Sequence, residues 1–171
     1  MEEKNLTCCF TGHRPEKLPW GGDESDARCL KLKEELACCI DGAYLAGCRH
    51  FICGMARGCD MLFAEAALAL RGKHPEVTLE AAIPCDTQAD GWRADERRRY
   101  EHLTAECDEV TFVAHAYSPG CMQRRNEYMV ERSDVLIAVF NGTAGGTMNT
   151  ILCAQRKGLR VITIDLVDYM R

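Results

Sequence analysis

Three short glycine-containing segments combine residue types that bind phosphate. They are residues 11–15 (TGHRP), 54–60 (GMARGCD) and 141–147 (NGTAGGT). Glycine lets a backbone approach a ligand closely, backbone N–H groups at a helix start attract anions, and arginine can hold a phosphate with two hydrogen bonds. Together the segments predict a site for the phosphate of a nucleotide or nucleotide-like ligand.

In the first segment, Thr11, Gly12 and Arg14 are the candidate ligand contacts. His13 lies between them and is a candidate catalytic base, because histidine titrates near neutral pH. A histidine beside a phosphate is often only a hydrogen-bond donor, so binding is the alternative role. Taken alone, the segment is equally typical of an ordinary strand-to-helix loop with a surface arginine.

In the second segment, Gly54, Arg57 and Gly58 directly precede a predicted helix. The N–H groups and dipole of a helix start make it a potential anion site. Asp60 is expected to act as the N-cap of that helix. Alternatively, its carboxylate accepts hydrogen bonds from ribose hydroxyls or a base edge, or serves as a second candidate catalytic group.

In the third segment, Gly145 and Gly146 leave room for a phosphate, and the amide and hydroxyl of Thr147 could donate to it. The segment is neither a Walker A loop nor a G-x-G-x-x-G motif. Arg125 and Asn126 begin another predicted helix and could reach the same ligand from the side. A solvated basic turn is the alternative for that run.

The elements that must position these segments follow from apolar runs that alternate with amphipathic stretches. We expect strands at 6–10, 49–53, 77–83, 109–113, 134–140 and 159–165, and helices at 24–46, 60–72, 93–106, 122–131 and 147–157. This order is typical of an α/β, Rossmann-like three-layer sandwich with a mainly parallel sheet. Such sheets bind ligands beyond the carboxyl ends of their strands, where all three glycine segments fall.

Size and charge limit the remaining possibilities. The 171 residues are expected to form a single domain over 1–171, and the net charge of −5 makes nucleic acid an unlikely partner. No apolar run approaches the roughly 18 residues of a membrane span, and the N-terminus does not resemble a signal peptide. We therefore expect a cytoplasmic protein with no membrane partner. The apolar helix faces at 61–70 would allow a homo-oligomer, although core packing explains them equally.

The twelve cysteines include no C-x-x-C pair. Most lie in apolar stretches, so core packing is expected rather than a disulfide framework, and no metal site is predicted. Cys59 and Cys121 fall at predicted helix starts, where a thiol pKa can be lowered, so either could be reactive.

The strings TGHRP, GMARGCD, QRRNEYMVERSD and NGTAGGTMNT together resemble the SLOG superfamily, and within it the YpsA-like branch, over residues 7–165. Related groups are the DNA-processing protein DprA (Smf) and the LOG phosphoribohydrolases. The resemblance implies a Rossmann-like fold and a nucleotide-derived ligand. It implies that this ligand is lined by Gly12, Arg14, Gly54, Arg57, Gly58, Asp60, Arg125, Asn126, Gly145, Gly146 and Thr147.

One departure from the LOG enzymes concerns catalysis. They carry P-G-G-x-G-T-x-x-E, in which the glutamate is catalytic, and aligning Gly146 and Thr147 with its G-T pair puts Thr150 at that position. The leading hypothesis is therefore a nucleotide-binding sensor or regulatory module whose ligand is unidentified. The alternative is a nucleotide-processing hydrolase acting on an N-glycosidic or phosphate bond. DprA-like nucleic-acid binding is the least favoured.

Overall fold

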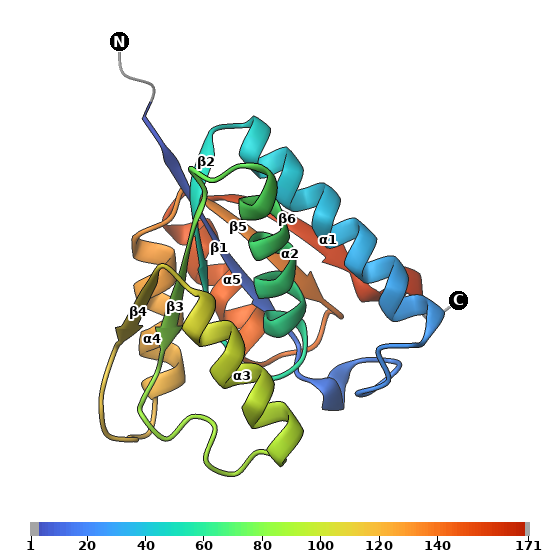
Figure 1. The fold of residues 1–171 in the computed structure, drawn as a ribbon, viewed down its shortest axis with the longest axis vertical. Coiled ribbons are helices and arrows are strands. Elements are labelled where there is room, and N and C mark those ends of the chain that lie inside the picture. Colours follow the sequence, from blue (N-terminus) through green and yellow to red (C-terminus); the bar gives the residue numbers. More distant parts are fainter. Residues whose placement is uncertain (1–3, 170–171) are drawn as a thin grey trace.

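The computed structural model describes residues 4–169 and contains a six-stranded sheet between two layers of helices (Figure 1). Its strands are β1 (Leu6–Gly12), β2 (Cys48–Cys53), β3 (Thr78–Ile83), β4 (Glu109–Phe112), β5 (Val135–Phe140) and β6 (Arg160–Asp165). Every pairing is parallel, in the order β4-β3-β2-β1-β5-β6. The predicted α/β, Rossmann-like fold is confirmed.

Helices cover both faces of the sheet. One face carries α1 (Ala27–Leu45), α2 (Cys59–Lys73) and α3 (Ala94–Glu106), and the other carries α4 (Cys121–Glu131) and α5 (Gly146–Arg156) (Figure 1). Short 3-10 helices occupy Pro15–Lys17 (η1) and Leu166–Tyr169 (η2). Because side chains alternate along a strand, Cys8 and Phe10 enter the core under α1 and α2, whereas Cys9 enters the core under α4 and α5.

Several boundaries differ from those predicted. The first helix begins at Ala27 rather than at residue 24, because the Asp26 carboxylate caps it by accepting the Arg28 backbone N–H at 2.8 Å. Strand β1 continues to Gly12 instead of ending at residue 10, because residues up to Gly12 stay paired with β5. The first residues of the TGHRP segment therefore belong to the sheet.

The strand order creates one switch point. From β1 the chain adds β2, β3 and β4 on one side, then returns past β1 to place β5 on its other side. The connections that leave β1 and β5 therefore diverge to opposite faces, and a crevice forms between their carboxyl ends. This topology brings the first and third glycine segments together.

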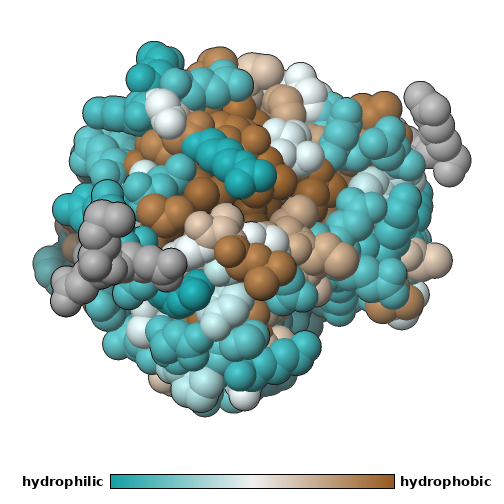
Figure 2. All heavy atoms as spheres, turned by 90° about the horizontal axis from the view of Figure 1, so that it is seen from above, coloured by the Kyte–Doolittle hydropathy of each residue, from teal (hydrophilic) through white to brown (hydrophobic). Residues whose placement is uncertain are grey.

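Apolar side chains also reach the surface. Seen from above Figure 1, they form a brown area framed by hydrophilic side chains (Figure 2). Leu45 is 84% exposed, the largest value among the big apolar side chains of residues 4–169. A homo-oligomer would need an exposed apolar surface of this kind, and the homo-oligomer stays a prediction. Within the same residues, no helix is both long and apolar enough to cross a membrane.

Candidate functional site

A cavity of about 290 Å³ lies at the switch point. The predicted ligand residues that line it are Thr11, Gly12, Arg14, Asp60, Arg125, Asn126, Gly146 and Thr147, and His13 lines it as well. Lys17 and Met122 also line it, although neither is among the predicted ligand contacts. A signal for Lys17 was available, because a second cation three residues after Arg14 in the same loop suits a phosphate site.

The start of α5 forms one wall of this cavity. The first backbone bond of the helix runs from the Asn149 N–H to the Gly145 carbonyl, 3.0 Å away. The N–H groups of Gly146 and Thr147 therefore have no acceptor within the helix, and they mark its positive end. A Cβ added to Gly146 would meet no atom within 4 Å. The wall thus presents free donors beside open space.

His13 ties the first loop to the third. Its buried ring places Nε2 2.9 Å from Asn141 Oδ1 and 3.1 Å from the Asn141 backbone nitrogen, while Nδ1 lies 3.4 Å from Thr147 Oγ1. Burial lowers the pKa of His13, and the charge of Lys17 lowers it further, against the opposing effect of the Asn141 hydrogen bond. The imidazole is therefore neutral at pH 7. It positions Asn141 and Thr147 at the entrance to α5.

Arg125 brings a buried cation to the opposite wall. The residue is 4% exposed, and its Nη1 donates to the carbonyls of Gly54 and Ala82 while Nε donates to Asn126 Oδ1 at 2.8 Å. Burial lowers its pKa and the Asp60 carboxylate raises it, but a guanidinium keeps its proton. The partner of Nη2 is the Met122 thioether, 3.7 Å away. A thioether is a weak acceptor, so this edge suits a stronger one.

Arg14 approaches the same sulfur from the loop after β1. Its Nη2 lies 3.9 Å from Met122 Sδ, and its side chain is exposed. Lys17 adds a third cation at the cavity, with Nζ 3.2 Å from the Ala144 carbonyl oxygen. Two arginines, a lysine and a helix N-terminus thus surround the cavity, against the carboxylates of Asp60 and Glu16. This balance favours an anionic ligand.

Asp60 does not cap α2 as expected. Gly58 occupies the cap position, and the buried Asp60 carboxylate accepts the Ala56 backbone N–H at 2.9 Å from inside the first turn. Burial raises the pKa of Asp60, while Arg125 and the Ala56 N–H act in the opposite direction. The carboxyl group therefore closes the second loop on itself and also lines the cavity.

The start of α2 is filled by protein groups, unlike the start of α5. The Cys59 N–H donates to the His13 carbonyl at 3.1 Å, and a Cβ on Gly58 would lie 2.7 Å from that carbonyl oxygen. A Cβ on Gly54 would collide with the Arg125 guanidinium. Neither glycine lines the cavity, and neither does Gly145. Gly54 and Gly58 allow close packing between loops, rather than the expected anion site at this helix start.

Residues 8–168 match the YspA SLOG family. The chain belongs to this family. Its relatives include the uncharacterized SPbeta prophage-derived protein YoqJ of Bacillus subtilis (strain 168), 31% identical over 140 residues that cover 74% of this chain and 82% of that protein. A UPF0398 protein of Bacillus anthracis (strain A0248) is 26% identical over 152 residues, which cover 86% of this chain and 80% of that protein. The predicted resemblance is confirmed.

Solved structures share the fold of this SLOG family member at lower identity. DNA processing protein A from Helicobacter pylori superimposes with a TM-score of 0.62 and 15% identity, covering 96% of this chain and 71% of that one. DNA processing protein A (DprA) from Streptococcus pneumoniae gives a TM-score of 0.54 and 15% identity, and the superposition covers 93% of this chain and 50% of that one. At this level of identity the likeness establishes the fold alone.

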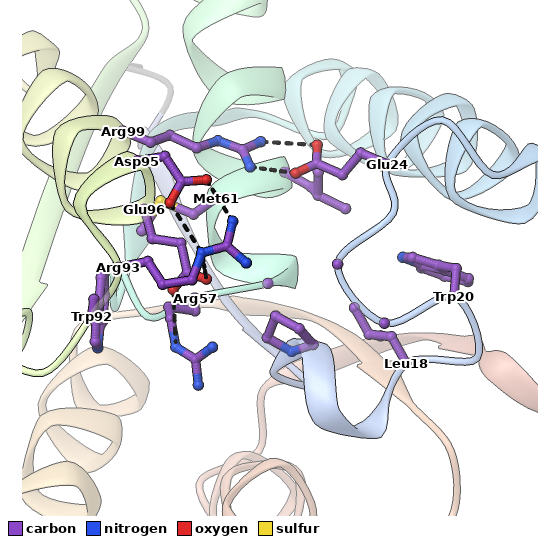
Figure 3. A pocket seen from close by; sticks show the side chains of 15 residues that line it. Leu18, Trp20, Glu24, Arg57, Met61, Trp92, Arg93, Asp95, Glu96 and Arg99 are labelled. Carbon is purple, nitrogen blue, oxygen red and sulfur yellow. Dashed lines mark hydrogen bonds and ion pairs between the residues drawn. The ribbon is translucent and has the colours of Figure 1, made fainter.

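The family member has a second cavity, of about 160 Å³, between residues 15–22 and the first turns of α2 and α3 (Figure 3). Arg57 lines it instead of the switch-point cavity, with ion pairs to Glu16 and Glu96. Arg99 is likewise paired with Glu24 (Figure 3). Because these arginines have carboxylate partners, the second cavity is a weaker candidate for an anion. Arg57 therefore lies apart from the predicted phosphate contacts that line the switch-point cavity.

The two cysteines at helix starts are both buried. Burial raises the pKa of Cys59, and the neighbouring Asp60 charge adds to this effect. The Cys59 thiol therefore stays protonated at neutral pH. Cys121 begins α4 and is 1% exposed. Thr150, at the position of the LOG glutamate, is completely buried and donates its hydroxyl to the Gly146 carbonyl at 2.9 Å.

Proposed function

We propose that the switch-point cavity binds the phosphate of a nucleotide or nucleotide-derived ligand, and that the protein acts as a sensor or regulatory module. The observation that carries this proposal is the buried guanidinium of Arg125, whose Nη2 meets only a thioether among residues 4–169. A buried donor without a good acceptor costs free energy unless a ligand supplies one. Phosphate oxygens are strong acceptors for guanidinium groups.

The opposite wall supplies the complementary donors. The amides of Gly146 and Thr147 would take phosphate oxygens at the α5 start, as helix N-termini do for many anions. Arg14 would close over the phosphate from the exposed side. The Asp60 carboxyl and the Asn126 amide would then face the sugar or base. The cavity volume of about 290 Å³ lies at the lower end of small-molecule sites.

Hydrolysis of the bound nucleotide is a second candidate, favoured by one observation. Asp60 is a buried carboxyl with a raised pKa that lines the cavity, and such groups are often general acids or bases. His13 is less suited to this role, since both ring nitrogens already contact Asn141 or Thr147. Incubation with nucleoside monophosphates and chromatography of products tests the reaction. Turnover that Asp60→Asn leaves unchanged would remove this residue from the mechanism.

Calorimetry against a panel of phosphate, nucleoside mono- and diphosphates, dinucleotides and ADP-ribose tests binding. The diagnostic variant is Gly146→Glu, because a side chain there enters open space and its carboxylate would repel a phosphate. Gly72→Glu is the matched control: it introduces the same charge at an exposed position near the end of α2, where an added Cβ also meets no atom. We expect binding in the wild type and the control and at least a roughly tenfold loss in Gly146→Glu.

Single-stranded DNA belongs in the same panel. The Helicobacter pylori protein is described by its single-stranded DNA binding mode, and a phosphodiester backbone could also use the cations at the cavity. The net charge of −5 argues against tight binding to such a polyanion. A folded wild type that binds no compound of the panel would refute the proposed function, and binding of the oligonucleotide alone would replace the nucleotide with DNA.

A further inference from the structure

A second group of polar side chains lies on the sheet away from the cavity. His50 of β2, Glu80 of β3 and Glu109 of β4 each offer one ligand atom, and these atoms lie within 4.8 Å of one another. The strand register brings them together. Glu80 is paired with Glu109 on one side and with Ile52 on the other, and His50 lies two residues before Ile52, on the same face of β2. We infer that these three side chains bind a divalent transition-metal ion such as Zn²⁺, contrary to the expectation that the protein has no metal site.

Glu80 is the first reason for this inference. It is flanked by the apolar residues Leu79 and Ala81 in β3 and is 3% exposed, although glutamate is rarely buried without a compensating partner. Its Oε2 accepts hydrogen bonds from Tyr128 at 2.6 Å and Thr111 at 3.0 Å, and Oε1 lies 2.8 Å from His50 Nε2. The carboxylate is thus ionised, fixed in orientation and directed at the imidazole.

The imidazole is oriented in the same way. His50 Nδ1 lies 2.7 Å from Thr78 Oγ1, which leaves Nε2 as the atom directed toward Glu80. Histidine ligands of metals are normally held through their second nitrogen, and carboxylate ligands are themselves hydrogen-bonded. Thr78 supplies the first of these supports, and Tyr128 and Thr111 supply the second. The supporting contacts of a metal site are therefore present around both residues.

Distances and charge agree with an ion at this position. Two ligand atoms that each lie about 2.1 Å from one metal ion are roughly 3.0–3.5 Å apart. His50 Nε2 and Glu80 Oε1 lie 2.8 Å apart in a hydrogen bond, and the three ligand atoms lie within 4.8 Å of one another, so small side-chain movements would bring all three to one ion. In the metal-bound protein the ion would take the place of the hydrogen bond between these two atoms. Glu109 adds a second carboxylate beside Glu80, and its side chain makes no hydrogen bond or ion pair with residues 4–169. A cation would relieve the repulsion between the Glu80 and Glu109 carboxylates, and a water molecule would be the fourth ligand of a tetrahedral site.

Cobalt titration of the full chain under reducing conditions tests the inference. Co²⁺ is the probe because its visible spectrum reports coordination, and a thiolate-to-cobalt charge-transfer band would reveal binding to cysteine instead. We expect one equivalent bound without that band, displacement by Zn²⁺, and a higher thermal unfolding midpoint with metal. The affinity should fall at least about tenfold in Glu109→Gln, which alters an exposed residue, and in His50→Ala.

His102→Ala and Glu101→Gln are the matched controls, because both change exposed residues of α3. They should bind cobalt as the wild type does. Absence of cobalt binding, a thiolate band, or equal affinity in the wild type and Glu109→Gln would each overturn the inference. Glu109→Gln keeps the test valid even if His50→Ala fails to fold.

Discussion

The clearest quantitative prediction concerns Glu80 and the acid stability of the sheet. Burial acts to raise the pKa of this carboxyl, but the hydrogen bonds from His50, Tyr128 and Thr111 outweigh it and bring the pKa from 4.5 to about 2. A carboxyl with a pKa that is lower in the folded state stabilises the protein while it is ionised. The stabilisation is therefore fully present above about pH 4.5 and is lost as the pH falls toward 2.

The size of the effect follows from the shift. A difference of about 2.5 pKa units corresponds to roughly 3 kcal/mol in the free energy of unfolding at neutral pH. Most of the loss falls in an accessible range, since about 2 kcal/mol of this contribution disappears between pH 5 and pH 3. In Glu80→Gln the titrating group is absent, so this pH-dependent contribution should vanish.

Urea unfolding at several pH values between 3 and 7 measures the difference, with a chelator present so that metal binding does not contribute. The advantage of the wild type over Glu80→Gln should shrink by about 2 kcal/mol from pH 5 to pH 3. Glu101→Gln, which removes an exposed carboxylate from α3, serves as the control and should follow the wild type. A difference between wild type and Glu80→Gln that stays constant with pH would refute the account of Glu80.

Three further predictions follow from the packing and from the cavity. Gly12→Ala should lower the free energy of unfolding by about 1–3 kcal/mol, because its Cβ would lie 2.6 Å from Cys59 Cβ; an unchanged urea midpoint would contradict this close packing. Arg14→Ala should weaken nucleotide binding about tenfold in calorimetry without moving the thermal midpoint. Arg124 is also exposed, and Arg124→Ala should leave both the nucleotide affinity and the thermal midpoint unchanged. Alkylation of the native protein followed by mass spectrometry should label exposed Cys38 and spare Cys59, and rapid labelling of Cys59 would show that it is accessible.

Local pattern was enough to predict the strands and the fold, because strand runs such as residues 135–140 are apolar throughout and lie between two helix layers. It was not enough to separate the glycines by role. Gly58 directly precedes a helix and Gly146 begins one. A Cβ added to Gly58 would contact the His13 carbonyl of a distant loop, whereas a Cβ added to Gly146 would enter open space. The group formed by His50, Glu80 and Glu109 depends on the register between three strands, and register cannot be predicted from a local sequence pattern. A glutamate inside an apolar strand was the only available sign of it.

The loop after β1 explains why only one of the two glycine-rich helix starts remains open. Its backbone turns toward α2, where the His13 carbonyl accepts the Cys59 N–H and so occupies the first donor of that helix. Its His13 side chain turns the other way, toward Asn141 and Thr147, and contacts the α5 entrance, where Gly146 and Thr147 line the cavity. A single loop therefore fills one helix start and frames the other. This division places the cavity on the α4 and α5 side of the switch point, where the buried edge of Arg125 can reach it.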